Sequence, residues 1–142
     1  MYPKLISHNI HRRSSSAASI GLRRFSLSRV PRQEFRDVSP EDFEKVVLKA
    51  GPKPVVVDFY ANWCQPCRML SPILEKYTRD SSNLDGKEVD LVTVNVDEQQ
   101  ELAAKYKISA LPTVVGFKNG QQTSQFVGLL NQSGVRKFLM DL

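Results

Sequence analysis

The chain has 142 residues, of which 41% are apolar and 25% charged, and its formal net charge is +5. This length suits one domain with a packed core, and the apolar fraction is typical of a globular protein rather than a disordered one. Because no uninterrupted apolar segment approaches the roughly 18–20 residues that span a bilayer, we expect no membrane insertion.

The positive charge is concentrated in residues 1–33, which contain seven basic side chains and no acidic one. The rest of the chain holds 13 basic and 15 acidic side chains, a net charge of about −2. The overall pI of about 9.4 therefore describes an extension and not the body of the protein. For this reason we expect no nucleic-acid partner.

Residues 1–33 are also rich in serine, and an Arg-rich, Ser-rich, acid-free N-terminus is typical of a mitochondrial transit peptide. The stretch R-R-F-S at 23–26 has an arginine two residues before a possible cut after Phe25. We therefore predict removal of the extension in the mitochondrial matrix and a folded domain over residues 34–142. The alternative is a disordered basic tail with no targeting role.

In the body of the chain, strand and helix patterns alternate before two strands follow one another. Ser39 and Pro40 are a helix start, and Asn119-Gly120 is a strong hairpin signal. The expected elements, in order, are a strand at 34–38, a helix from 39 to about 50, a strand at 54–60, a helix at 64–79, a loop at 81–87, a strand at 89–96, a helix at 98–106, strands at 113–117 and 125–127, and a helix at 131–142. This order predicts an α/β fold with a central mixed sheet of about five strands, flanked by about four helices.

Cys64 and Cys67 are the only cysteines, and they lie where a buried strand leads into a helix. Cys64 is expected at the helix N-terminus, where free backbone N–H groups and the helix dipole stabilise a thiolate. We expect Cys64 to be ionised and open to water, and Cys67, one turn later, to be covered. Pro66 restrains the loop between them, and Arg68 adds a neighbouring cation.

Other interpretations of the cysteine pair are weaker. A structural zinc ion needs four ligands, and the only histidines, His8 and His11, lie in the segment expected to be removed. A purely stabilising disulfide would close a ring too short to remove much chain entropy. Two buried cysteines that act as small apolar side chains remain an alternative to a redox pair.

Four stretches make residues 35–142 resemble the thioredoxin family, and they occur in the family's order and spacing. They are V-D-F-Y-A-N-W-C-Q-P-C at 57–67, A-L-P-T at 110–113, F-K-N-G at 117–120 and F-V-G at 126–128. Together with the transit-like extension, they resemble the mitochondrial members most. The resemblance implies a thioredoxin fold and a protein-disulfide reductase that carries electrons without a bound cofactor.

The same resemblance implies roles for both cysteines. Cys64 would be the nucleophile that attacks a target disulfide, and Cys67 the resolving thiol that closes a redox-active Cys64–Cys67 disulfide. An NADPH-dependent thioredoxin reductase would restore the dithiol. The implied partners are this reductase and disulfide-containing proteins such as peroxiredoxins, with the chain acting as a monomer.

Asp58 is the one charged residue in the apolar run V-V-V-D-F-Y. Burial disfavours the ionised carboxylate, so we expect the pKa of Asp58 to be raised. The resemblance places it beneath the cysteines, where it would accept the proton of Cys67. The alternative is an aspartate satisfied by local hydrogen bonds, with no part in catalysis.

The resemblance also implies a flat, mostly apolar collar that docks target segments, formed by Trp63, Pro66, Leu111, Pro112 and Gly128. It implies a cis peptide bond before Pro112, which would leave Leu111 able to pair with an extended substrate. The alternatives are an ordinary trans-proline turn and, for Trp63, simple core packing.

The chain departs from the family pattern at two positions. Gln65 replaces a glycine between the cysteines, and with Pro66 it would tune the reduction potential, which we expect to stay reducing. Thr93 occupies the place of a lysine near the buried acid, so Asp58 would lack that cation. Gly116, within an expected strand, marks a close packing contact.

Three other functions use the same features. A more oxidising pair would make the protein a disulfide oxidase or isomerase. A thioredoxin-fold binding module would hold partners without chemistry, and two chains would share a metal or cluster through their cysteine pairs.

Overall fold

The computed structural model describes residues 33–142. Residues 1–32 carry nearly all of the predicted targeting segment, including the cut after Phe25, and lie outside the described part. No helix in residues 33–142 is both long enough and apolar enough to cross a bilayer.

The described chain forms a mixed five-stranded sheet in the order β1-β3-β2-β4-β5. Strands β1, β3 and β2 are parallel to one another. Strand β4 pairs antiparallel with β2, and β5 pairs antiparallel with β4. The strands are Glu34–Phe35 (β1), Val55–Tyr60 (β2), Asp90–Asn95 (β3), Thr113–Lys118 (β4) and Gln121–Val127 (β5). The α-helices are Pro40–Phe43 (α1), Gln65–Arg79 (α2), Gln100–Lys105 (α3) and Gln132–Asp141 (α4). The predicted α/β fold, with a central mixed sheet of five strands flanked by helices, is therefore confirmed.

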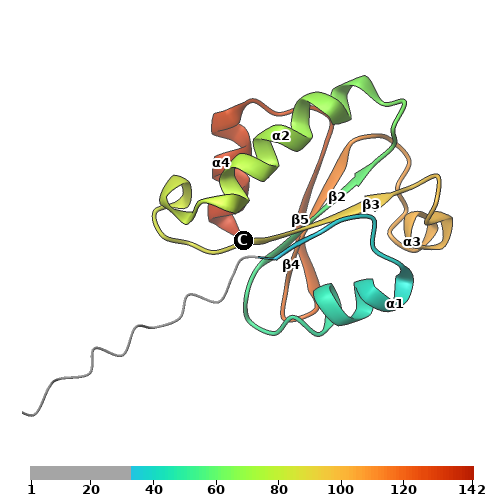
Figure 1. Ribbon diagram of the computed structural model, residues 1–142, viewed down its shortest axis with the longest axis horizontal. Helices are drawn as coiled ribbons and strands as arrows, with labels where there is room; N and C mark the ends of the chain where they lie inside the picture. The colour runs from blue at the N-terminus through green and yellow to red at the C-terminus, as the bar shows by residue number, and fades with distance from the viewer. Residues whose placement is uncertain (1–32) are drawn as a thin grey trace, which may run out of the picture.

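The helices cover both faces of the sheet, with α2 and α4 on one side and α1 and α3 on the other (Figure 1). Successive residues of β2 point to opposite faces: Val57 and Phe59 pack in the α1 and α3 layer, and Val56 packs in the α2 and α4 layer. Asp58 shares the face of Val56 by this alternation. The central strand therefore delivers a carboxylate to the layer that contains α2.

Some boundaries differ from the prediction for local reasons. Strand β1 ends at Phe35 because Asp37 has a left-handed backbone, with a φ of 50°. Strand β5 begins at Gln121, four residues earlier than expected. Both turn residues, Asn119 and Gly120, have positive φ, so pairing resumes at once between Lys118 and Gln121.

Two short helices were not expected as such. The helix that begins at Ser39, whose hydroxyl accepts the Asp42 N–H at 3.2 Å, ends in a π-helical turn, η1 (Glu44–Leu48). The expected loop at 81–87 instead opens with a 3₁₀ helix, η2 (Ser81–Leu84), because the Asp80 side chain accepts the Ser82 N–H at 2.9 Å.

Candidate functional site

Cys64 and Cys67 form a disulfide at the start of α2, with their Cα atoms 5.3 Å apart. Cys64 is the N-cap, and its sulfur accepts the backbone N–H of Cys67 at 3.3 Å. Gln65 and Pro66 fill the first turn and are exposed. The free N–H groups and the dipole of this 15-residue helix therefore point at the sulfur of Cys64, as predicted.

The expectation that Cys64 is open to water is wrong for the disulfide form. Cys64 is 4% exposed and Cys67 1%, and both pack against Ala61 and, from a neighbouring loop, Leu111. In this form the sulfur of Cys64 is bonded to the sulfur of Cys67 and accepts the backbone N–H of that residue. The order of exposure agrees with the prediction, with Cys67 the more covered of the two.

Asp58 is 1% exposed, and its surroundings only partly satisfy it. The Ser71 hydroxyl of α2 donates to Oδ2 at 3.1 Å, and Oδ1 has no hydrogen-bond partner within residues 33–142. Burial raises the pKa of Asp58 to about 7, opposed by the Ser71 hydrogen bond and assisted by the negative charge of Glu75. The predicted rise of the pKa is confirmed, and local hydrogen bonds do not saturate this carboxylate.

A cavity of about 530 Å³ lies behind the disulfide. Cys67 and Ser71 of α2 line it together with Tyr60, at the end of β2, and Thr93 of β3. Thr93 pairs with Asp58 across the sheet, as the departure from the family pattern predicted. Cys67, although 1% exposed, therefore forms part of the wall of this cavity.

The predicted collar residues differ in exposure, and Leu111 is the distant one among them that packs against the cysteines in the described contacts. Trp63 is 70% exposed and Pro66 is exposed, whereas Leu111 and Gly128 are half-buried. The Leu111–Pro112 peptide bond is cis, and the Gly128 N–H donates to the Pro112 carbonyl at 2.8 Å. The expectation of a surface position is wrong for Pro112, which is buried where β4 begins. The exposure of Trp63 excludes simple core packing.

Sequence reasoning missed three polar contacts. The Trp63 indole N–H donates to Asp97 at 3.0 Å, and the Arg68 guanidinium donates to the Asn62 carbonyl at 2.6 and 3.1 Å. Both contacts fix the loop before Cys64. The third is the hydrogen bond from the Ser71 hydroxyl to Asp58. Ser71 lies four residues after Cys67 and therefore on the same face of α2. That spacing was the available signal.

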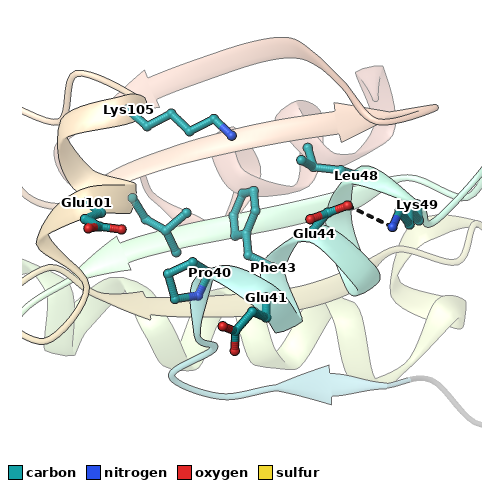
Figure 2. A pocket seen from close by; sticks show the side chains of 9 residues that line it. Pro40, Glu41, Phe43, Glu44, Leu48, Lys49, Glu101 and Lys105 are labelled. Atoms are coloured by element: carbon teal, nitrogen blue, oxygen red, sulfur yellow. Dashed lines mark ion pairs between the residues drawn. The ribbon is translucent and has the colours of Figure 1, made fainter.

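A second pocket of the described chain lies away from the cysteine pair. This pocket, of about 600 Å³, lies between α1 and α3 and is lined by Phe43, Glu44, Lys49 and other residues, none of them a cysteine (Figure 2). Its Glu44 and Lys49 pair with each other at 2.8 Å. Within residues 33–142, no three His, Cys, Asp or Glu side chains come together as a metal site.

The comparisons with known proteins agree on one family. The model of the family described as thioredoxin matches residues 34–141. The chain is 43% identical to a thioredoxin of Rickettsia bellii over 103 residues, which are 72% of this chain and 93% of the relative. It is 38% identical to the mitochondrial thioredoxin of Rattus norvegicus over 120 residues, 84% of this chain and 69% of the relative. The solved thioredoxin of Malassezia sympodialis is 37% identical, with a TM-score of 0.67, over 79% of this chain and 93% of that one.

Proposed function

The chain belongs to the thioredoxin family, and on this premise we propose how its site residues divide the work of disulfide exchange. The protein is a protein-disulfide oxidoreductase that acts by dithiol–disulfide exchange, and its redox centre is the Cys64–Cys67 disulfide. The observation that carries the proposal is the position of this disulfide at the N-terminus of α2, where Ser71 links Cys67 to the buried carboxylate of Asp58, whose Oδ1 has no hydrogen-bond partner within residues 33–142.

In the dithiol form, Cys64 is the nucleophile. Its place at the helix N-terminus stabilises the thiolate, because N–H groups and the helix dipole face the sulfur. The thiolate attacks one sulfur of a target disulfide, and the other target sulfur leaves as a thiolate. A mixed disulfide then joins Cys64 to the target.

Cys67 resolves the mixed disulfide, and Asp58 supports that step. Asp58 takes the proton of the Cys67 thiol, and the resulting thiolate attacks the sulfur of Cys64. A carboxylate whose pKa is about 7 suits a base that must accept and release a proton near neutral pH. Trp63, Pro66, Leu111 and Gly128 dock the target beside the pair, while Gln65 and Pro66 tune its potential.

We further propose that a thioredoxin reductase that draws on NADPH returns the disulfide to the dithiol, and that the targets are disulfide-containing proteins of the peroxiredoxin kind. The mitochondrial matrix is the proposed location. Its support is the composition of residues 1–33 and the 38% identity to a mitochondrial relative. A reporter fused to residues 1–33 tests the location, because diffuse cytosolic signal would overturn it.

One assay tests the reaction and its closest rivals. Purified protein, NADPH, a thioredoxin reductase and insulin are mixed, and NADPH oxidation and insulin precipitation are followed. We expect turnover that Cys64→Ser abolishes. Turnover that survives Cys64→Ser would overturn the assignment, and binding of insulin without reduction would favour the binding module. Equilibration with glutathione measures the reduction potential of the cysteine pair. It separates a reductase, with a reduction potential of about −270 mV, from a DsbA-like oxidase, with one of about −120 mV.

A further inference from the structure

The Ser71 hydroxyl lies between Asp58 and the first turn of α2. Its oxygen is 3.1 Å from Asp58 Oδ2 and 3.0 Å from the backbone carbonyl oxygen of Cys67. Ser71 lines the cavity beside Cys67, whereas Asp58 does not. We propose that Ser71 is the proton relay between Asp58 and the solvent of this cavity, an inference that rests on the proposed roles of Cys67 and Asp58.

The two acceptors explain why a hydroxyl suits this place. A serine has one proton to donate and lone pairs to accept. When Asp58 is ionised, the hydroxyl donates to Oδ2. When Asp58 is protonated, the carboxylic acid donates to Ser71, and Ser71 donates to the Cys67 carbonyl. Each protonation state of Asp58 thus has a hydrogen-bonded partner, and a rotation of one hydroxyl connects them.

The burial of Asp58 makes such a relay necessary. The carboxylate is 1% exposed, so a proton that enters or leaves it must pass through a neighbouring group. Ser71 is the group that bonds to Asp58 and also reaches the cavity, which Cys67 lines as well. A proton leaving the Cys67 thiol into the cavity therefore reaches Asp58 through Ser71.

Several charged and titratable groups lie around the cavity. On α2, Glu75 faces Asp58 and favours its protonated form. The others that line the cavity are Arg36, Asp37, Tyr60 and Arg68. The Tyr60 hydroxyl donates to Asp37, and Arg36 pairs with Glu75 at 3.1 Å. Arg68 donates to the Asn62 carbonyl instead, so among these contacts Ser71 is the link to Asp58.

The Cys67 S–H bond breaks, its proton passes to cavity solvent, a solvent proton passes to the Ser71 oxygen, and the Ser71 hydroxyl proton passes to Asp58. Cys67 sulfur bonds to Cys64 sulfur, and the bond from Cys64 to the target sulfur breaks. The target sulfur takes the electron pair of that bond and a proton from solvent. Asp58 later releases its proton along the same path in reverse.

A merely structural role would give Ser71 a different signature. Serine and threonine in helices often bond to the carbonyl four residues earlier, and Thr78 on the same helix does so with Leu74 at 2.9 Å. If the bond to Cys67 were the only purpose of Ser71, its removal would change stability but not pH dependence. Thr78→Ala is therefore the matched control.

The test measures how fast the mixed disulfide between Cys64 and insulin disappears, by acid quench and mass spectrometry, from pH 5 to 9. We expect Ser71→Ala to slow the disappearance of the mixed disulfide by about tenfold, which is part of the 10²–10⁴-fold that positioned proton transfer supplies. We also expect the variant to raise the midpoint of the curve of this rate against pH. Ser71→Thr, which keeps the hydroxyl, restores both. In a protein that already carries Asp58→Asn, Ser71→Ala should have no further effect on the rate. The control variant Thr78→Ala, made in the wild-type protein, should leave both the rate and its pH midpoint unchanged.

Wild-type rate and midpoint in Ser71→Ala would overturn the relay, as would a loss that persists in the Asp58→Asn background. Mixtures of H₂O and D₂O give a second test on the wild-type protein. More than one proton in motion predicts a curved dependence of rate on deuterium fraction, and a straight line would overturn the relay. If Asp58→Asn itself were without effect, the proposed function would fail first, which separates the two outcomes.

Discussion

Thr93 lies directly beside Asp58 in the register of β3 and β2, yet its hydroxyl accepts the Asp37 N–H at 3.0 Å instead of bonding to the carboxylate. Neighbours in register point to the same face of a sheet. The residue best placed to stabilise the ionised form of Asp58 thus gives it neither a charge nor a hydrogen bond. The pKa of Asp58 is consequently set by burial, with Ser71 as the opposing contact.

We predict that Thr93→Lys lowers the pKa of Asp58, because a cation within about 4–6 Å favours a carboxylate, by roughly 1–3 pH units. The pH midpoint of mixed-disulfide resolution should fall with it. Thr93→Met is the matched control, since it has similar length, no charge and the same loss of the Asp37 contact. A carboxyl carbon NMR titration of Asp58 checks the result, and equal midpoints in the lysine and methionine variants would contradict it.

The raised pKa of Asp58 also predicts how stability depends on pH. The pKa is about 7 in the folded protein and 3.8 ordinarily, so between these values the folded state holds a proton that the unfolded state releases. This contribution to stability is greatest below pH 3.8, falls as the pH rises toward 7 and is constant above. A pKa difference of this size corresponds to roughly 4 kcal/mol in the free energy of unfolding.

Asp58→Asn removes this titration, so the variant should gain stability relative to the wild type as the pH rises. We expect its relative free energy of unfolding to increase by up to roughly 4 kcal/mol from pH 4 to pH 8. Urea unfolding of the disulfide forms at several pH values measures this. A difference independent of pH would show that Asp58 has an ordinary pKa.

The cysteine pair and the buried acid could be predicted because each leaves a local signal, and the mixed sheet could be predicted from the order of strand and helix patterns along the chain. An acid in an apolar strand and two cysteines before a helix are visible in a few consecutive residues. Ser71 could not be identified in this way, because a serine in a helix looks ordinary until the helix is placed against β2. The burial of Pro112 depends similarly on the packing of β4, and the Trp63–Asp97 contact joins residues 34 positions apart.

The exposed indole of Trp63 predicts a docking role that stability measurements will not detect. Truncating an interface aromatic commonly costs about 2 kcal/mol in binding, so Trp63→Ala should raise KM for insulin by tenfold or more. Thermal stability should change little, because the side chain is 70% exposed. Met69→Ala is the control, as Met69 is 54% exposed but lies outside the collar. A small aromatic disulfide should be reduced at the wild-type rate, and an equal loss for both substrates would contradict docking.

Gly116 confirms the close contact expected within a strand. A methyl group at this position would collide with the side chain of Leu142, which is 6% exposed and packs in the α2 and α4 layer. Because overpacking a filled core typically costs about 1–3 kcal/mol, Gly116→Ala should destabilise the protein by that amount. Leu142→Ala makes room for the methyl group, so the double variant should lose less stability than the sum of the two single variants. Urea unfolding of the four proteins gives the coupling, and strict additivity would show that the strain lies elsewhere in β4.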